Sequence, residues 1–342
     1  MDLVSFRETA ERYSVIFLDA YGVLKSSTGL IDGALETVSS LIAAGKEVFV
    51  VTNDSSRSPE SMAERYAQQA GGQLLPPERY ISSGLLAAEY LEKQIPYGKV
   101  AYLGKPESAH YIEIAGKIPV PVADCTAKDN IVAIALLDDE GFDWFRDVNS
   151  TLNLIRRTNV PVVVANADIT YPMRGNDIAI AVGSIGRLLS DITEKTFVRF
   201  GKPDSMIFAY ALARAREQIP KVTKRDVLFV GDTLRTDIVG ASTYGFDSTL
   251  VLSGNTPPRT RRSRDSIVGH HPHVHQRVDS HIARSLSLAL SLALPLALAL
   301  ALRLALTLRL ALTLANRGTG ERDAGFHRTA RLAIVAGGTW GV

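Results

Sequence analysis

The sequence has almost no cysteine and almost no net charge. Its 342 residues include a single cysteine, Cys125, and 38 basic residues against 36 acidic ones. A single cysteine excludes a disulfide within the chain and a zinc site built from several cysteines, and it is typical of a reducing compartment. A net charge of +2 gives no overall field that would attract nucleic acid or an anionic membrane. We therefore expect a cytoplasmic protein without a nucleic-acid partner.

The N-terminal segment lacks the apolar stretch of a secretory signal. Residues 1–12 carry the acidic side chains of Asp2, Glu8 and Glu11, whereas a signal peptide has a basic start followed by a continuous apolar region. Export is therefore not expected. A chain of 342 residues is long enough for about two domains with a substantial core.

The composition changes abruptly near residue 258. Six of the seven histidines follow residue 269, and every even position from Leu286 to Leu314 is leucine. A two-residue repeat has neither the period of an amphipathic helix nor turn chemistry, so we interpret 258–342 as a low-complexity or frame-shifted tail. Its charge-free run at 286–302 is at the lower limit for a membrane span and contains Pro295. Membrane association is therefore not expected, and a weak anchor remains an alternative.

The rest of the chain alternates the patterns of buried strands and helices. Apolar runs at 15–18, 46–52 and 226–230 are separated by helical patterns, one at 33–44 and one that starts at 58–60 and is closed by glycines at 71–72. Continuous apolar runs suit the strands of a parallel sheet that is covered on both faces. The sequence therefore predicts an α/β fold, whose ligands are expected beyond the carboxyl ends of the strands.

Polar side chains follow three of these predicted strands. In a parallel sheet they would meet at one edge, where carboxylates suit Mg²⁺ and a lysine and a hydroxyl can neutralise phosphoryl oxygens. The sequence therefore predicts a site for Mg²⁺ and a phosphate at this edge. Its candidate residues are Asp19, Thr52, Asn53, Lys202, Asp232 and Asp237.

Four segments, FLDAYGVL, VVTND, GKPDSMIFAYAL and GDTLRTDIVGA, resemble the four motifs of the haloacid dehalogenase (HAD) superfamily. With TNDSSRSPE and NADITYP, they are similar to subfamily IIA, the 4-nitrophenylphosphatase and phosphoglycolate phosphatase-like group. The resemblance covers residues 14–254. It implies a Rossmann-like parallel-sheet core at 1–82 and 189–257, with an α/β cap domain inserted at 83–188.

The resemblance also implies a chemistry. The expected reaction is Mg²⁺-dependent hydrolysis of a small phosphorylated metabolite through an aspartyl phosphate on Asp19. Thr52 and Asn53 would bind the phosphoryl oxygens, and Lys202 would hold the nucleophile and the phosphate together. The implied metal site comprises Asp19, the carbonyl of Tyr21, Asp232 and Asp237, and the implied substrate contacts of the cap are Asn166, Asp168 and Tyr171.

Tyr21 departs from the phosphatase pattern. Phosphatases of this superfamily usually carry a second Asp there, as general acid and base, and tyrosine is neutral near pH 7. We therefore expect reduced activity. The sequence DAYG also resembles the first loop of 2-haloacid dehalogenases, which need no metal, and a protein that binds a phosphorylated ligand without turnover is a third interpretation. The retained Asp232 and Asp237 favour the phosphatase. The substrate and the formation of a homo-oligomer are not decided by the sequence.

Overall fold

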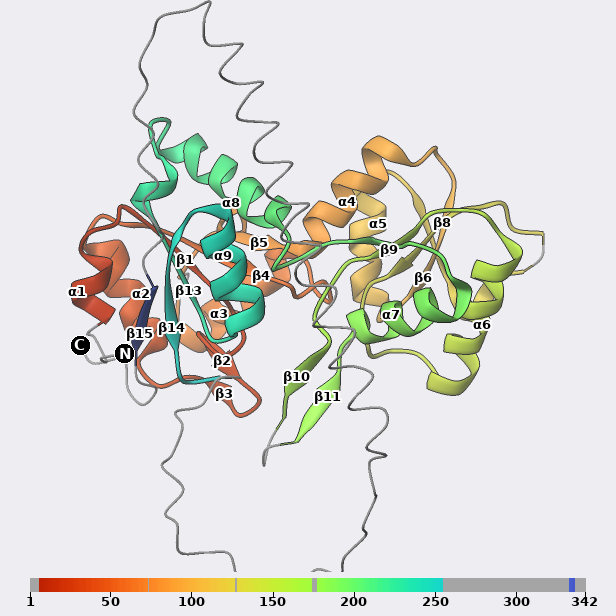
Figure 1. Cartoon of the computed structure of the whole chain (residues 1–342), viewed down its shortest axis with the longest axis horizontal. Helices are drawn as coiled ribbons and strands as arrows, with labels where there is room; N and C mark the ends of the chain where they lie inside the picture. Colours follow the sequence, from red (N-terminus) through yellow and green to blue (C-terminus); the bar gives the residue numbers. More distant parts are fainter. Residues whose placement is uncertain (1–5, 73, 127, 174–176, 255–331, 336–342) are drawn as a thin grey trace, which may run out of the picture. The chain divides into compact units, whose positions relative to one another are not determined.

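The protein is described by a computed structural model, which covers residues 6–72, 74–126, 128–173, 177–254 and 332–335. Within this part of the chain, two parallel sheets are each built from strands that alternate with helices (Figure 1). The expected α/β class is confirmed. The residues 258–331 and 336–342 of the predicted tail lie outside the described residues.

The first sheet has six parallel strands, in the order β15-β14-β13-β1-β4-β5. These are β1 (Val15–Leu18), β4 (Glu47–Thr52), β5 (Tyr80–Ser82), β13 (Val227–Gly231), β14 (Asp247–Val251) and β15 (Leu332–Val335). β1 lies in the middle, and Phe17 is in register with Phe49 on one side and Phe229 on the other. All four residues of β1 are buried, as the apolar run predicts.

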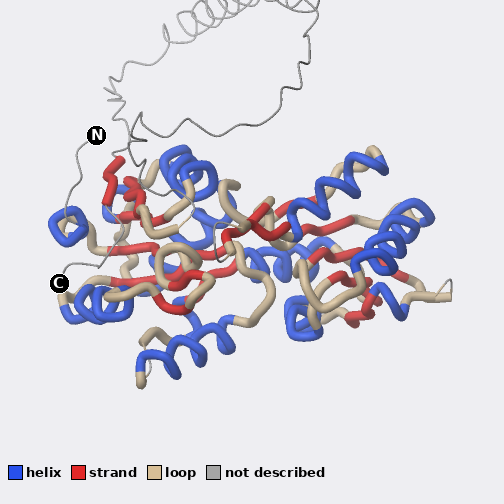
Figure 2. Tube along the Cα trace, turned by 90° about the horizontal axis from the view of Figure 1, so that it is seen from below, coloured by secondary structure: helices blue, strands red, loops and turns tan. Residues whose placement is uncertain are grey.

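Helices cover both faces of this sheet, as Figure 2 shows. They are α1 (Phe6–Ala10), α2 (Ala34–Ala43), α3 (Pro59–Ala70), α8 (Ser205–Gln218) and α9 (Val239–Tyr244). Because side chains alternate along a strand, Val15 and Phe17 belong to a cluster with Phe208 of α8, whereas Ile16 and Leu18 belong to a cluster with residues of α2 and α3. Each buried side chain of this size contributes about 1.5–3 kcal/mol, so the position of β1 is firmly fixed.

The second sheet has five parallel strands, in the order β12-β9-β8-β6-β7. They are β6 (Lys99–Leu103), β7 (Ile118–Pro121), β8 (Ile131–Leu136), β9 (Val162–Val164) and β12 (Val198–Arg199). The helices in this region are α4 (Ser83–Gln94), α5 (His110–Ile114), α6 (Trp144–Arg157) and α7 (Val182–Thr193). Two antiparallel pairs complete the strands, β2 (Lys25–Ser26) with β3 (Gly29–Leu30) and β10 (Thr170–Pro172) with β11 (Ile178–Ile180).

The strand pairing changes one predicted boundary. The cap was predicted to end at residue 188. However, α7 continues through that position to Thr193, and β12 pairs with β9 in the second sheet. The second sheet therefore extends to Arg199. β12 has only two residues, and so short a segment has no pattern that tells which sheet it joins.

The far end of the chain adds a strand to the first sheet. β15 lies within the predicted tail and pairs in parallel with β14, with Leu332 opposite Ser248. No helix among the described residues is long and apolar enough to cross a membrane. The leucine-rich run at 286–314 lies outside the described residues, so the alternative of a weak anchor stays untested.

Candidate active site

The three predicted strand ends meet at one edge of the first sheet. Asp19 directly follows β1, and its backbone N–H donates to the carbonyl of Val230 in the neighbouring β13 at 2.9 Å. Thr52 ends β4, on the other side of β1, and Asp232 follows β13. The parallel order of β13, β1 and β4 therefore brings the candidate residues together.

Asp19, Asp232 and Asp237 form a compact group of carboxylates. Each offers a ligand atom, and these atoms lie within 4.8 Å of one another. All three residues are buried, with 8%, 1% and 0% of their surface exposed. A glycine makes room for this group, because a Cβ at Gly22, where φ is 86°, would lie 2.3 Å from the Cγ of Asp232. The backbone there can approach Asp232 only without a side chain.

Lys202 joins two of these carboxylates. Its Nζ lies 2.6 Å from Oδ1 of Asp19 and 2.7 Å from Oδ1 of Asp237, and only 2% of the residue is exposed. Burial would lower the pKa of Lys202, but the two carboxylates raise it above its usual value, so the amine is a cation. Asp237 lies in a π-helical turn, Leu234–Ile238, where its Oδ2 accepts from the backbone N–H of Thr233 at 3.0 Å. It holds Lys202 in place.

The group carries more negative than positive charge. Burial raises the pKa of Asp19 well above its usual value, Lys202 opposes this, and the nearby Asp237 and Asp232 raise it further. A divalent cation would offset this excess, and carboxylate oxygens are the ligands that Mg²⁺ prefers. The residues present therefore fit the expected ion.

Asn53 connects the second strand end with Lys202 and with the cap. Its side-chain oxygen accepts from the backbone N–H of Lys202 at 2.6 Å, and its Nδ2 donates to the carbonyl of Lys202 at 3.0 Å and to Oδ1 of Asp168 at 2.9 Å. The amide is thus used to hold neighbouring loops. Thr52 lies beside it, and its Oγ1 accepts from the N–H of Asp54 at 3.2 Å.

Tyr21 is tied to the cap rather than to its own loop. Its hydroxyl donates to the carbonyl of Pro172 at 2.6 Å, and its ring meets that of Tyr171 edge-on, with centroids 6.4 Å apart. Burial raises the pKa of the phenol above its usual value. Tyr21 is therefore a protonated tether between the first loop and β10, a contact that no sequence pattern indicated.

The three predicted cap residues have different roles. Asn166 stays within its own loop, where its Oδ1 accepts from the N–H of Asp168 at 2.8 Å. The Asp168 carboxylate reaches Asn53, and the Tyr171 hydroxyl donates to Oδ2 of Asp139 at 2.9 Å. All three line the same cavity as Asp19, and their contact with a substrate stays a prediction.

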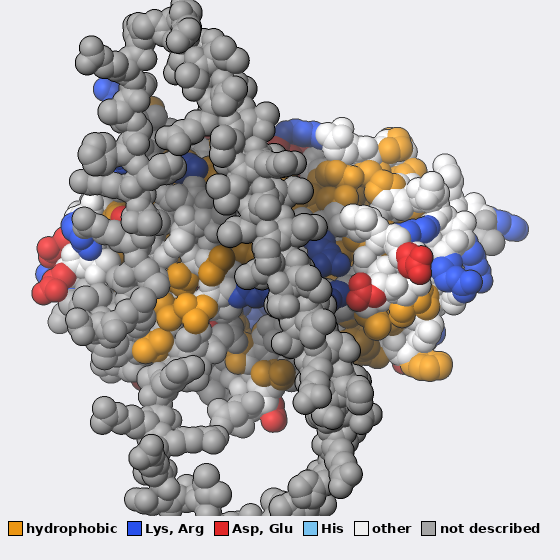
Figure 3. Space-filling view, in the orientation of Figure 1, with side chains coloured by type: hydrophobic (Ala, Val, Ile, Leu, Met, Phe, Trp, Pro, Cys, Tyr) orange, Lys and Arg blue, Asp and Glu red, His pale blue; other side chains and the backbone are white. Residues whose placement is uncertain are grey.

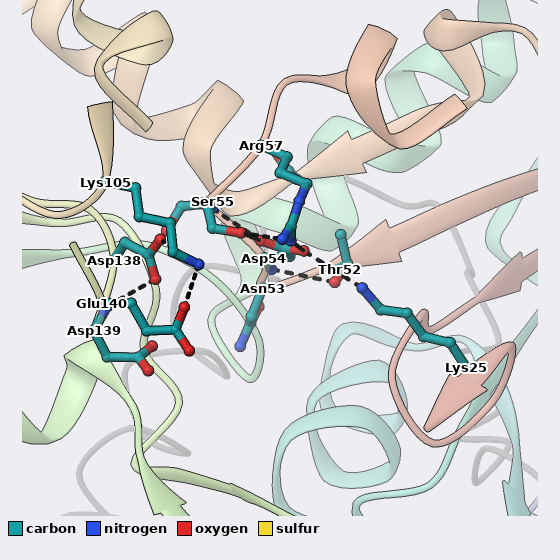
Figure 4. A network of polar contacts seen from close by, with 12 residues as sticks. Lys25, Thr52, Asn53, Asp54, Ser55, Arg57, Lys105, Asp138, Asp139 and Glu140 are labelled. Atoms are coloured by element: carbon teal, nitrogen blue, oxygen red, sulfur yellow. Dashed lines mark hydrogen bonds and ion pairs between the residues drawn. The ribbon is translucent and has the colours of Figure 1, made fainter. Parts of the chain in front are cut away.

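A second polar network in this cavity was missed (Figure 4). On the side of the first sheet, Asp54 lies 3.7 Å from Lys25 and 3.8 Å from Arg57. On the cap, Lys105 lies 3.7 Å from Asp138 and pairs with Glu140. Ser55 joins the two sides by donating to the carbonyl of Leu137 at 2.5 Å.

The signal for the cap half of this network was present in the sequence. Residues 138–140 read Asp-Asp-Glu and follow β8 closely, so they obey the same rule of strand ends that identified Asp19. Burial raises the pKa of Asp138 to about 6, and Lys105 only partly opposes this effect. Figure 3 shows basic and acidic side chains close together on the face seen in Figure 1.

The cavity that these residues line has a volume of about 880 Å³. This size is typical of a site for a small molecule. Its walls come from both sheets, because Asp19 and Lys202 line it together with Asp138 and Tyr171. The arrangement can hold a phosphoryl group against the first sheet and the rest of a small metabolite against the cap.

Comparisons with known proteins agree with this arrangement. Residues 16–117 match a family described as haloacid dehalogenase-like hydrolase, and residues 199–278 match a HAD-hydrolase-like family. The crystal structure of a possible sugar phosphatase of the HAD superfamily from Cytophaga hutchinsonii is 42% identical, with a TM-score of 0.71, and the match covers 75% of this chain and 91% of that one. This chain belongs to the haloacid dehalogenase superfamily. The resemblance seen in the sequence is therefore confirmed.

Two further similar proteins carry a substrate in their names. Glycerol-3-phosphate phosphatase from Gallus gallus is 28% identical, over 72% of this chain and 82% of that protein. The structure of glycerol phosphate phosphatase from Mycobacterium tuberculosis in complex with magnesium is 26% identical, covers 72% of this chain and 70% of that one, and has a TM-score of 0.60. Both are phosphatases by name, and the second holds the ion that the carboxylate group of this chain fits.

Proposed function

We propose that this HAD protein is a Mg²⁺-dependent phosphatase that hydrolyses the phosphate ester of a small sugar or polyol through an aspartyl phosphate on Asp19. One observation carries the proposal: Lys202 bridges Asp19 and Asp237 beside a third buried carboxylate, Asp232. The names of the similar proteins, a possible sugar phosphatase and a glycerol-3-phosphate phosphatase, support the substrate class.

The chain supplies a nucleophile that is held in one orientation. Oδ1 of Asp19 accepts from the N–H of Ala20 at 2.7 Å and from Lys202 at 2.6 Å. These contacts fix the carboxylate and favour its ionised, nucleophilic form. Its other oxygen can then attack phosphorus in line with the leaving oxygen, a reaction that depends mostly on positioning and charge.

The phosphoryl oxygens would be bound by groups already in place. The Lys202 ammonium lies beside the nucleophile, and the Thr52 hydroxyl, which accepts from the N–H of Asp54, keeps its own proton to donate. Mg²⁺ would be held by Asp19, Asp232 and the carbonyl of Tyr21, with Asp237 nearby, and when bound it would neutralise the charge between nucleophile and phosphate.

Contacts between the cap and the first sheet would shield the reaction from water. They run from Tyr21 to Pro172, from Asn53 to Asp168 and from Ser55 to Leu137. Exclusion of water strengthens each electrostatic interaction at the site and protects the aspartyl phosphate until the alcohol has left.

The two alternatives have less support. A dehalogenase that works without metal would have no cation to offset the excess charge of the buried Asp232 and Asp237 carboxylates. A protein that binds without turnover would keep the same metal and phosphate groups, so only an assay separates it from a phosphatase.

The experiment is a turnover assay of the full chain with 4-nitrophenyl phosphate and a panel of sugar and polyol phosphates, with Mg²⁺ or with EDTA. We expect release of phosphate that requires the ion. Asp232→Asn should lower Mg²⁺ affinity in titration calorimetry and abolish turnover, whereas the exposed Glu217→Gln on α8 should change neither. Dehalogenation of 2-chloropropionate in EDTA, or Mg²⁺ binding with no turnover of any ester, would each contradict the proposal.

A further inference from the structure

One carboxylate in the cavity has no role in the scheme above. Asp168 reaches the cavity from the loop before β10, and its Oδ1 accepts from Nδ2 of Asn53 at 2.9 Å. Among the described residues, no other side chain bonds its carboxylate and no cation pairs with it at ion-pair distance. The side-chain amide of Asn53 also bonds the backbone of Lys202. Asp168 is therefore linked to Lys202 through one intervening residue, Asn53.

The proposed reaction needs an acid on the cap side of the phosphate. The alkoxide of a sugar or polyol is strongly basic, so it must receive a proton as it leaves. Attack and departure are in line, so the leaving oxygen lies on the face of phosphorus opposite to Asp19. Because Asp19 is at the edge of the first sheet, that oxygen faces the cap.

Most of the other acids around the cavity are already engaged. The pKa of Asp54 lies below its usual value although the residue is buried, because Lys25, the N–H and hydroxyl of Ser56, and Arg57 stabilise its charge. Asp54 therefore remains ionised. Glu140 pairs with Lys105, and Asp139 accepts from Tyr171.

The remaining groups are no better placed. Asp204 caps α8 by accepting from the N–H of Met206 at 2.8 Å. The Tyr21 phenol donates to Pro172, and Asp138 has its Oδ2 buried beside Lys105. Asp168 alone among these cavity-lining acids bonds the network that holds Lys202 and the nucleophile.

We propose that Asp168 is the general acid and base of the reaction, brought by the cap in place of a carboxylate at position 21. The inference rests on the proposed function. As Asp19 forms its bond to phosphorus, the bond from phosphorus to the leaving oxygen breaks and that oxygen takes the proton of Asp168, which releases the alcohol. The Asp168 carboxylate then takes a proton from water, whose oxygen attacks phosphorus, so that inorganic phosphate leaves and Asp19 is regenerated.

The surroundings of Asp168 suit both halves of this cycle. Burial raises its pKa to about 6, Lys202 and the hydrogen bond from Asn53 oppose this, and the charges of Asp237 and Asp54 add to it. A group of this acidity exists in both protonation states near neutral pH, so it can give a proton in one step and accept one in the next.

The test compares two leaving groups in Asp168→Asn. Hydrolysis of glycerol 3-phosphate should fall by roughly 10²- to 10⁴-fold, the usual contribution of a general acid, while formation of the aspartyl phosphate from 4-nitrophenyl phosphate should change far less, because 4-nitrophenolate leaves without a proton. Pre-steady-state release of 4-nitrophenolate measures that first step. Glu217→Gln, which changes an exposed carboxylate of α8 outside the cavity lining, should leave both rates unchanged.

A second carboxylate should restore what the first variant loses. In the Asp168→Asn background, Tyr21→Asp should recover the glycerol 3-phosphate rate at least tenfold, whereas Tyr21→Phe, which removes the same hydroxyl without adding an acid, should not. Thermal melting checks folding, and Asp168→Ser, which keeps an acceptor for Asn53 but no acid, replaces Asp168→Asn if that variant does not fold.

The outcomes separate the two proposals. Equal losses in glycerol 3-phosphate hydrolysis and in the pre-steady-state release of 4-nitrophenolate, or equal effects of Tyr21→Asp and Tyr21→Phe, would show that Asp168 only positions Asn53 and would overturn the inference. If the unchanged protein hydrolyses neither ester, the proposed function itself fails, and the inference fails with it.

Discussion

Two groups of carboxylates, each of which contributes a residue to the lining of the same cavity, are held in different ways. At the edge of the first sheet, Asp19 and Asp237 lie 2.6 and 2.7 Å from Lys202, and all three are almost fully buried. On the cap, Asp138 lies 3.7 Å from Lys105, whose side chain is 27% exposed. The first group has a fixed geometry, which suits a phosphoryl group that is the same in every substrate. The second can adjust, which suits the part of a substrate that varies.

The largest difference should appear when each lysine is replaced. Lys202→Met leaves two buried carboxylates without their partner, so without Mg²⁺ it should lower the free energy of unfolding by about 3–5 kcal/mol. Turnover should fall at least 10²- to 10³-fold, the loss typical of one charge-stabilising donor. Lys105→Met breaks the 3.7 Å pair with Asp138 and the pair with the exposed Glu140. Because Lys105 is itself partly exposed, each pair should contribute at most about 1 kcal/mol.

Urea unfolding in EDTA and steady-state kinetics in Mg²⁺ measure the two effects. Equal destabilisation by both variants would mean that the two groups are held equally tightly, and the comparison would then be wrong. Addition of Mg²⁺ should partly restore the stability of Lys202→Met, because the ion replaces one of the two missing attractions.

The next effect depends on pH and concerns Asp138. Its folded-state pKa is raised to about 6 from a usual 3.8, so the folded protein binds a proton more readily than the unfolded chain. This contribution to stability is fully present below about pH 4 and is lost as pH rises through 6. Asp138→Asn has no such loss. Relative to the unchanged protein, it should therefore gain roughly 1–3 kcal/mol between pH 4 and 7.

Urea unfolding at pH 4, 5, 6 and 7 checks this expectation. Asp54→Asn is a matched comparison, because the pKa of Asp54 is lowered and its contribution has the opposite sign, present above the usual pKa and lost as pH falls. A constant stability difference between Asp138→Asn and the unchanged protein at all four pH values would contradict a raised pKa.

The same contrast explains what the sequence could predict. Asp19, Thr52 and Asp232 follow continuous apolar runs, and the rule that parallel strands end at one edge is enough to bring them together. Lys202 follows no such run, and its role was predicted from the segment GKPDSMIFAYAL, which resembles a superfamily motif. Asp138 also follows such a run, but nothing in the chain indicates that the ends of β8 and β4 face one cavity.

Contacts over long sequence distances were the part that could not be predicted. The hydrogen bond from Tyr21 to Pro172 spans 151 residues, and no pattern at either end specifies it. The two residues of β12 and the four of β15 carry too little pattern to choose a sheet. Local spacing predicts strands and their ends, while the packing of one sheet region against another decides which ends share a cavity.

The smallest expected effect tests the tether between the two groups. Tyr21→Phe removes a hydroxyl that donates to the carbonyl of Pro172 at 2.6 Å, and a hydrogen bond of this kind contributes about 0.5–1.5 kcal/mol. Because the tether holds the cap against the first loop, its loss should raise KM for a sugar phosphate by up to about tenfold, with little change in kcat.

The control is Tyr66→Phe, since the buried Tyr66 hydroxyl has no hydrogen-bond partner among the described residues. The control loses the same atom without losing a bond, so it should leave KM unchanged and be neutral or slightly stabilising in thermal melting. If the two variants behave alike, the Tyr21 hydroxyl does not hold the cap, and the first loop and the cap wall bind the substrate independently.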